Sequence, residues 1–355
     1  MYNFIILLPF FIVVLSCCNK NFNKILAPAI LLIIGTIVSL RDISVDRDSF
    51  VYFTVYGELI KLNDLNEILI YSTNLGQEPG FLILMKFFSS LGFSFFSFRA
   101  IFEMLTLYSL FFFIKRICDT NFFLITLLIY IAMFILFRDF TQIRFSFSSC
   151  MALNSIYYRL KNRNTLSILF LIFGILVHNA ILIIIPILLC ANCKFIYNLK
   201  FYVSAIFFAI LLFKFDFFMS LINTGLLPHQ ITRYIGQDEA VGNTFGITML
   251  MTTALSFIMC VAFRPDYGAD YKLLYINMFL ATIVSFIFMN IPIMMRMQLL
   301  CFTAIIILPN VISRYWVKRN IANIMLIQLS FATFSIIYFY SILSSEIVYE
   351  YKSIL

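Results

Sequence analysis

Charge is scarce in this chain, and its scarcity decides the class of protein. Only 12% of the 355 residues are charged, whereas 63% are hydrophobic, and the mean hydropathy is +1.00. A soluble domain of this length needs charged and polar side chains over most of its surface. The composition therefore excludes a soluble protein and predicts an integral membrane protein with several spans.

Tryptophan and glycine are also rare. With one Trp, the 19 Tyr must supply most of any aromatic belt at the membrane surface. Eleven Gly are few for a transporter, whose sliding helices use Gly at close contacts. The eight Cys lie mostly in apolar runs and are expected to act as small hydrophobic residues. Cys190 and Cys193 have the C-x-x-C spacing, but no His or second Cys pair lies near them, so we expect no metal site and no cofactor there.

The net charge of +8 indicates orientation in a membrane and not binding to nucleic acid. Six short linkers taken as cytoplasmic hold fourteen of the 25 Lys and Arg and three of the 17 acids. These linkers are 19–24, 115–120, 159–164, 191–200, 264–272 and 313–320. The asymmetry predicts about twelve spans with both termini outside the cytoplasm.

Two apolar segments are too long for one span each. Residues 79–114 are predicted to form a short helix followed by a full span, and residues 165–191 to form two short helices that meet near His178 and Asn179. We therefore expect one all-α membrane domain, 1–355, with two longer outer-face loops at about 41–78 and 214–244.

Arginines among the apolar runs are the first candidates for a site. An arginine at the centre of a spanning helix costs on the order of 3 kcal/mol, so it is a functional hypothesis by default. Its planar charged fork pairs well with phosphate oxygens. We predict that Arg144 and Arg296 bind a lipid-linked pyrophosphate, with Arg138 and Arg233 as second choices. The alternative is a structural arginine at a helix end, such as Arg138 paired with Asp139.

Five short motifs follow one another in a recognisable order. They are Arg41-Asp42-x-x-x-Asp46-x-Asp48-x-x-x-Tyr52, Glu78-Pro79-Gly80-Phe81, Gln142-Ile143-Arg144, His178-Asn179-Ala180 and Met295-Arg296. Over roughly residues 36–310 the chain resembles the EpsG-like branch of the Wzy polysaccharide polymerases. It departs from that pattern at Asn179, where a small residue is usual, and at Val45-Asp46-Arg47-Asp48, which replaces Gly-x-Asp. The second departure leaves open which of the two acids holds the key position.

The resemblance implies a membrane glycosyltransferase. Such enzymes polymerise oligosaccharide repeat units, carried on undecaprenyl pyrophosphate, into O-antigen or exopolysaccharide at the periplasmic face of the bacterial inner membrane. A chain-length regulator and a flippase are expected partners on the same ground. Although Asp46-Arg47-Asp48 has the D-x-D spacing, it lies on the predicted outer face, where nucleotide sugars are not available. We therefore expect a metal-independent enzyme.

Three residues are candidates for the base that activates the acceptor hydroxyl: Asp46, Asp48 and His178. The competing interpretations are a solvated acidic loop for the acids and a histidine satisfied by a backbone carbonyl. Arg41, Gln142 and Tyr52 belong to the motifs of the resemblance and complete the expected substrate-binding set. Tyr52 could instead anchor at the membrane surface. Glu78, which precedes Pro79, is interpreted as a helix cap.

Two other functions remain open. A ligase that transfers finished glycan to a lipid A core uses the same donor chemistry, but it usually has a larger second outer loop than 214–244. A flippase or transporter would have pseudo-symmetric halves and Gly or Pro breaks in matching spans. The charges lie mainly near one face and we find no internal repeat, which favours the polymerase.

Overall fold

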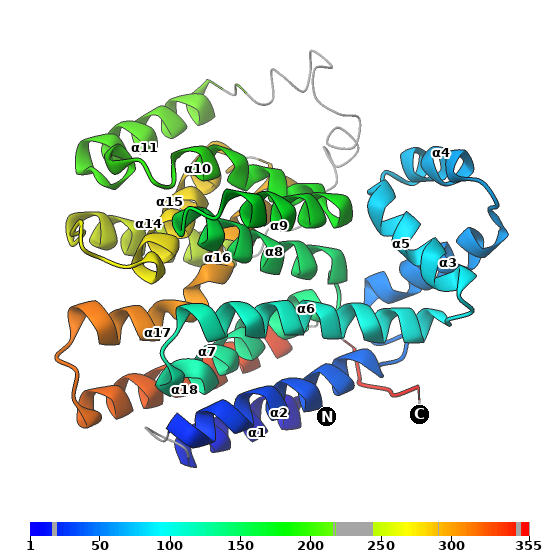
Figure 1. Ribbon diagram of the computed structural model, residues 1–355, viewed down its shortest axis with the longest axis horizontal. Coiled ribbons are helices and arrows are strands. Elements are labelled where there is room, and N and C mark those ends of the chain that lie inside the picture. The colour runs from blue at the N-terminus through cyan, green and yellow to red at the C-terminus, as the bar shows by residue number, and fades with distance from the viewer. Residues whose placement is uncertain (16–19, 216, 218–243, 290, 346–348, 355) are drawn as a thin grey trace. The chain divides into compact units, whose positions relative to one another are not determined.

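The computed structural model describes residues 1–15, 20–215, 217, 244–289, 291–345 and 349–354, and its helices are labelled in Figure 1. In these ranges the regular structure is helical, apart from an isolated bridge between Arg41 and Ser353. The expected all-α fold is confirmed.

The helices follow one another with short connections. The first part of the chain forms α1 (Tyr2–Leu15), α2 (Lys20–Ser39), α3 (Arg47–Lys61), α4 (Leu65–Leu75), α5 (Pro79–Ser90), α6 (Phe95–Ile117), η1 (Thr120–Phe122), α7 (Phe123–Tyr130) and η2 (Ile131–Asp139). The second part forms α8 (Ile143–Leu160), α9 (Asn164–Val177), η3 (Asn179–Ile184), α10 (Ile185–Cys190), η4 (Lys194–Tyr197), α11 (Leu199–Lys214), α14 (Thr244–Val261), α15 (Ala269–Ile287), α16 (Pro292–Phe302), η5 (Thr303–Ile307), α17 (Leu308–Val311), η6 (Ile312–Trp316) and α18 (Ile321–Leu343).

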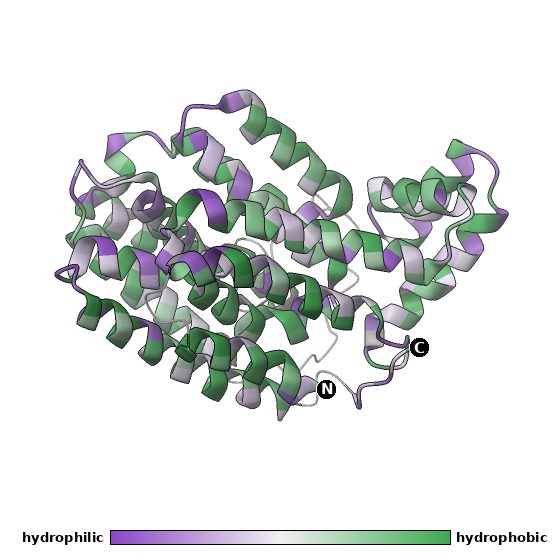
Figure 2. Ribbon diagram, turned by 60° about the horizontal axis from the view of Figure 1, so that its bottom comes forward, coloured by the Kyte–Doolittle hydropathy of each residue, from purple (hydrophilic) through white to green (hydrophobic). Residues whose placement is uncertain are grey.

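Six described helical stretches are long and apolar enough to cross a membrane. They are Asn21–Ser39, Phe95–Ile117, Thr120–Asp139, Ala269–Ile287, Met294–Trp316 and Ile321–Leu343. Shorter apolar helices accompany them, and Figure 2 shows hydrophobic residues along most helices, with hydrophilic ones mainly at helix ends and connections. The protein is therefore a polytopic helical membrane protein, whereas the count of about twelve spans stays a prediction.

Both long apolar segments break into two parts, as the sequence predicts, and the second break lies at the predicted position. Ser94 caps α6 by accepting a hydrogen bond from the amide of Ser97, which separates α5 from α6. The second break falls at His178, between α9 and η3. These breaks place helix ends, with their polar backbone groups, next to the apolar helices.

The chain forms two compact units. Unit 1 comprises Met1–Asn154, Ile172–Asn179 and Ile306–Leu355, and unit 2 comprises Ser155–Leu171 and Ala180–Ile305. In unit 1, α2 packs on α6 and α7, and α18 packs on α1, α7 and η2. In unit 2, α15 packs on α11, α14 and α16. Because α8 and α9 contribute to both units, the units are not successive segments of sequence.

The segment 41–78, predicted as a long loop, contains α3 and α4. Asp46 caps α3 by accepting hydrogen bonds from the amides of Asp48 and Ser49, and Asp64 forms a capping box with Glu67 at α4. Three of the acids in this segment, Asp46, Asp64 and Glu67, therefore cap helices and do not mark a solvated loop. The second predicted loop, 214–244, lies almost entirely outside the described residues.

One face of α3 belongs to an apolar core. Tyr52, Val55, Tyr56 and Leu59 recur at helical spacing and are at most 5% exposed, and burying each contributes roughly 1.5–3 kcal/mol. They join buried side chains of α5 and the start of α6, together with one residue each from α4, α8 and α9. Figure 1 shows α3, α4 and α5 grouped beside the first turns of α6.

Gly80 allows α5 to approach the end of α9 closely. A Cβ at this position would lie 2.8 Å from the Leu176 Cβ and 2.9 Å from its carbonyl carbon. Backbone atoms cannot move aside as a flexible side chain can, so a larger residue would push the two helices apart. Gly80 thereby sets the distance between the start of α5, at Glu78, and the end of α9, at His178.

We predict that Gly80→Ala destabilises the protein by about 1–3 kcal/mol, because it overpacks this contact. Gly57→Ala is the matched control: it lies within α3, a Cβ there meets nothing within 4 Å, and alanine favours a helix. Thermal unfolding of the purified variants in detergent measures both effects. Equal melting temperatures for the two variants would contradict the assigned close approach.

Candidate active site

The carboxylate of Glu78 joins three segments of unit 1. Its Oε2 forms an ion pair with Nη1 of Arg144 on α8. Its Oε1 lies 2.7 Å from Nδ1 of His178 and accepts a hydrogen bond of 3.0 Å from the amide of Asn179. One carboxylate thus holds a guanidinium on one oxygen and an imidazole on the other.

Aromatic side chains surround the guanidinium of Arg144. Its Nε donates to the Tyr52 hydroxyl at 3.3 Å. The central guanidinium carbon, Cζ, lies 5.6 Å from the ring centres of both Tyr52 and Phe81. The side chains of Glu78, Arg144 and His178 are 9%, 17% and 29% exposed. The carboxylate is therefore enclosed, while the side chains of its two partners are partly exposed.

Burial and charge act in opposite directions on Glu78. Burial by itself would raise the pKa of this carboxyl, because it disfavours the charged form. The hydrogen bond and charge of His178, the charge of Arg144 and the Asn179 amide outweigh burial and lower the pKa from 4.5 to about 2. Glu78 is therefore ionised throughout the physiological range and acts as an acceptor for its neighbours.

A second cluster lies fully buried at the start of α3. Nε of Arg41 lies 3.1 Å from Asp46 Oδ2 and its Nη1 lies 3.5 Å from Glu103 Oε1. The remaining donors of Arg41 reach the carbonyls of Val38 and Phe140, each at 2.6 Å. Arg99 donates to the carbonyls of Ser39 and Arg41 and to the Ser49 hydroxyl. This cluster ties the ends of α2 and η2 to α3 and α6.

The C-terminal residues run beside the same turn. The amide of Asp42 donates to the Lys352 carbonyl at 2.8 Å, that of Tyr349 to Val45 at 2.9 Å and that of Ile354 to Leu40 at 3.0 Å. The C-terminal segment therefore supports the backbone that carries Arg41.

A third polar group belongs to the π-helix η2. The Tyr130 hydroxyl donates to Asp139 at 2.9 Å, and the Ser146 hydroxyl donates to the same carboxylate at 2.8 Å. Arg138 is fully buried, with its guanidinium 4.3 Å from the ring centre of Phe134 and 5.1 Å from that of Phe145. π-Helical turns are frequent at functional sites, and here the turn leads directly to Arg144.

The structure brings together Arg144, His178 and Tyr52 from the predicted set. Asp48, one turn before Tyr52 on α3, lies close enough for its charge to act on both Tyr52 and Arg144. Asp46 and Arg41 lie in the buried cluster, where Asp46 serves as a helix cap and an ion-pair partner. The structure does not test the roles predicted for these residues.

The other predicted residues lie elsewhere. Gln142 precedes α8, and its amide donates to the Arg138 carbonyl at 2.7 Å. Arg296 is partly buried on α16 in unit 2, and Arg233 lies outside the described residues. Their substrate-binding roles stay predictions.

Glu78 is the functional candidate that sequence reasoning missed. It does sit at the start of α5 before Pro79, but its side chain makes no cap hydrogen bond and turns to Arg144 and His178 instead. The available signal was an acid in the motif Glu78-Pro79-Gly80-Phe81. Glu103, four residues after Arg99 on α6, lies nearest to Arg41.

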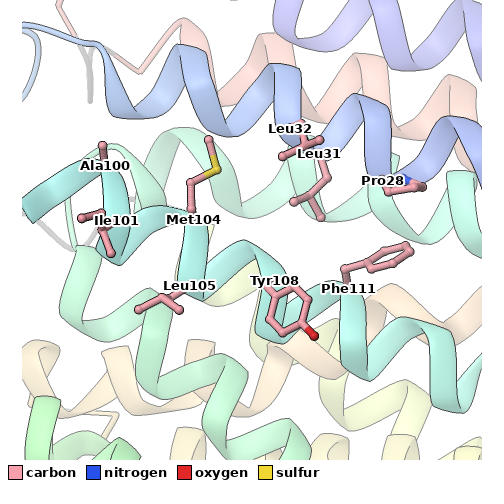
Figure 3. A pocket seen from close by; sticks show the side chains of 9 residues that line it. All are labelled: Pro28, Leu31, Leu32, Ala100, Ile101, Met104, Leu105, Tyr108 and Phe111. Carbon is pink, nitrogen blue, oxygen red and sulfur yellow. The ribbon is translucent and has the colours of Figure 1, made fainter. Parts of the chain in front are cut away.

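A separate apolar groove of about 690 Å³ lies between α2 and α6. Figure 3 shows its lining: Pro28, Leu31, Leu32, Ala100, Ile101, Met104, Leu105, Tyr108 and Phe111. The Tyr108 hydroxyl is the polar side-chain group among these residues, so the groove has no charge to bind pyrophosphate. The charged groups that could carry chemistry converge instead at Glu78, Arg144 and His178.

Comparison with models of known protein families shows to which family this chain belongs. The model of the EpsG family matches residues 24–353. The chain belongs to the EpsG family. No curated protein and no solved structure matches it significantly. As an EpsG family member with several apolar helices, it is a polysaccharide-polymerase-type membrane protein.

We predict that the stability of this EpsG family protein falls at acidic pH through Glu78. A carboxyl with a lowered pKa stabilises the fold fully above its unfolded value of 4.5, and this contribution is lost as the pH falls through about 2. Glu78→Gln should therefore cost on the order of 3 kcal/mol at neutral pH and progressively less below about pH 4. Melting temperatures in detergent from about pH 6 to about pH 3 measure the difference. A constant difference across this range would be inconsistent with the ionised carboxylate.

We also predict that the two acids of the D-x-D motif differ in structural weight. Asp46→Ala removes a helix cap and a buried ion-pair partner of Arg41, which should cost about 3–5 kcal/mol. Asp48→Ala should cost less than about 1 kcal/mol, because it removes a partly exposed first-turn charge and leaves the Asp46 cap in place. Unfolding of both variants in the same detergent compares them, and equal losses would refute the assignment of Asp46 to the buried cluster.

Proposed function

We propose that this protein polymerises oligosaccharide repeat units carried on undecaprenyl pyrophosphate, forming O-antigen or exopolysaccharide. The observation that carries the proposal is the convergence of Arg144 and His178 on one carboxylate. Arg144, a permanently charged group that can bind phosphate, and His178, a group that can accept a proton, thus lie on either side of the same partly exposed carboxylate contact. Membership of the EpsG family supports the same reaction class.

Arg144 would bind the pyrophosphate of the donor. Charge develops on this group as the bond to the sugar breaks, and positioned cations are usually the largest source of transition-state stabilisation. The Tyr52 and Phe81 rings fix the guanidinium and shield one side from water. Arg296 is proposed as a second phosphate ligand on the basis of its motif.

His178 would act as the base. Its Nδ1 faces Glu78, so Nε2 is the nitrogen that can take the proton from the acceptor hydroxyl. His178 is a better candidate for the base than Asp46. The carboxylate oxygens of Asp46 already accept hydrogen bonds from Arg41, from Ser49 and from the Asp48 amide. Asp48 remains a candidate for orienting the sugar, because it lies near Tyr52 and Arg144.

The location follows from the proposed donor. We propose that the site faces the periplasm from the inner membrane, where lipid-linked repeat units are presented. A flippase would deliver the units, and a chain-length regulator would limit the product. No metal and no cofactor are needed, because the pyrophosphate is already activated as a leaving group.

The test is complementation of a deletion strain. We expect Arg144→Ala to reduce polymer by about 10²–10³-fold and to leave glycans of a single repeat unit, as seen on gels of extracted polysaccharide. Arg144→Lys should restore little, because lysine lacks the bidentate fork. Arg163→Ala, at an exposed arginine, is the matched control and should restore full polymer.

Two results would count against the proposal. Full polymer from Arg144→Ala, with equal membrane content of both proteins, would remove Arg144 from the site. Loss of every repeat unit in the deletion strain would indicate a flippase or a ligase.

A further inference from the structure

Glu78 serves two partners with one charge, and this sharing has a mechanistic consequence. We propose that Glu78 is a positioning residue that couples donor binding to the strength of the base. When pyrophosphate draws Arg144 away, the carboxylate keeps His178 as its one side-chain partner, together with the Asn179 amide. The inference rests on the proposed function and deepens it.

The carboxylate keeps its place without Arg144. Its Oε1 is held by the Asn179 amide at 3.0 Å and by Nδ1 of His178 at 2.7 Å. The close approach of Gly80 to Leu176 fixes the backbone beneath it. Oε2, the oxygen on Arg144, is therefore the one that loses its partner when a substrate competes.

The donors and the exposure of Arg144 allow it to exchange Glu78 for the pyrophosphate of a donor. A guanidinium has five N–H donors, of which Nε is on Tyr52 and Nη1 is on Glu78. Pyrophosphate carries more negative charge than a carboxylate and accepts two parallel hydrogen bonds. The side chain is 17% exposed, so a donor headgroup can reach it while Tyr52 and Phe81 hold its plane.

The exchange changes the electrostatic environment of the His178 imidazole. Before donor binding, the positive charge of Arg144 offsets the charge of Glu78. Afterwards the charge of Arg144 is neutralised by the donor, so the negative charge of Glu78 beside Nδ1 can stabilise the positive charge that the ring gains when it takes the acceptor proton. The base is therefore strongest only when the donor is in place, which disfavours unproductive proton transfer in its absence.

The resulting step balances. The acceptor hydroxyl oxygen forms a bond to the anomeric carbon of the donor, and the bond from that carbon to the pyrophosphate oxygen breaks. Its electron pair leaves with the pyrophosphate, held by Arg144. The hydroxyl proton passes to Nε2 of His178, and Glu78 holds the imidazolium through Nδ1–H.

Histidine scarcity gives a direct measurement of the first part. The chain has two His, His178 and His229, so ¹⁵N-histidine labelling in a His229→Gln background leaves one imidazole to observe. At alkaline pH we expect the proton on Nδ1 and a bare Nε2 in the protein with Glu78. Glu78→Gln should lower the Nδ1–H population, whereas the exposed-acid control Glu58→Gln should leave it unchanged.

Binding of farnesyl pyrophosphate, a short prenyl pyrophosphate, tests the coupling. Because Glu78 competes for Arg144, Glu78→Gln should bind this probe at least about fivefold more tightly while polymer formation falls by about 10²–10⁴-fold. Arg144→Ala should bind it more weakly. Glu78→Asp, which keeps the charge but is one methylene shorter, should recover part of the activity lost in Glu78→Gln.

The outcomes separate the two ideas. Weaker probe binding by Glu78→Gln, with wild-type binding and polymer intact, would overturn the coupling and leave the proposed function in place. An unchanged His178 tautomer in Glu78→Gln would overturn the positioning role. If wild-type protein fails to bind the probe and Arg144→Ala makes full polymer, Arg144 is not part of the site and the coupling falls, although the protein still polymerises. Loss of every repeat unit in the deletion strain would overturn the proposed function and the coupling with it.

Discussion

The shared carboxylate of Glu78 is the interaction on which the candidate site depends. It joins α5, α8 and the end of α9, three segments far apart in the sequence, through Arg144, His178 and the Asn179 amide. An ionised group this enclosed is stable only with such partners. The approach of Gly80 to Leu176 makes the geometry possible, so backbone packing and charge pairing depend on each other.

The fully buried cluster around Arg41 has a different task. Arg41 and Arg99 together with Asp46 and Glu103 lie in apolar surroundings, where unpaired charges would be costly. Backbone carbonyls at the ends of α2 and η2 accept further hydrogen bonds from the two guanidinium groups. The cluster orients the start of α3 and thereby Tyr52, which lies under the guanidinium of Arg144. Fully buried arginines and a partly exposed arginine, Arg144, thus coexist in one unit.

Hydropathy and local signals predicted much of the fold. The interruptions at Ser94 and His178 follow from polar residues inside segments too long for one span. Helices α3 and α4 were missed because their acids read as a solvated loop, although those acids cap helices. Arg144 and His178 stood out as polar residues in apolar runs, but the role of Glu78 was hidden. Its position before Pro79 is explained locally by a helix start. Its partners are revealed only by packing against segments 66 and 100 residues away in the sequence.

The central claim is that Arg144 exchanges Glu78 for a pyrophosphate while Glu78 keeps His178. A cryo-electron microscopy structure of the protein in nanodiscs with a non-hydrolysable undecaprenyl pyrophosphate glycan tests this most directly. The account predicts the guanidinium of Arg144 on the phosphate oxygens, with the contact between Glu78 and Nδ1 of His178 preserved. A pyrophosphate bound elsewhere, with Arg144 still paired to Glu78, would contradict it.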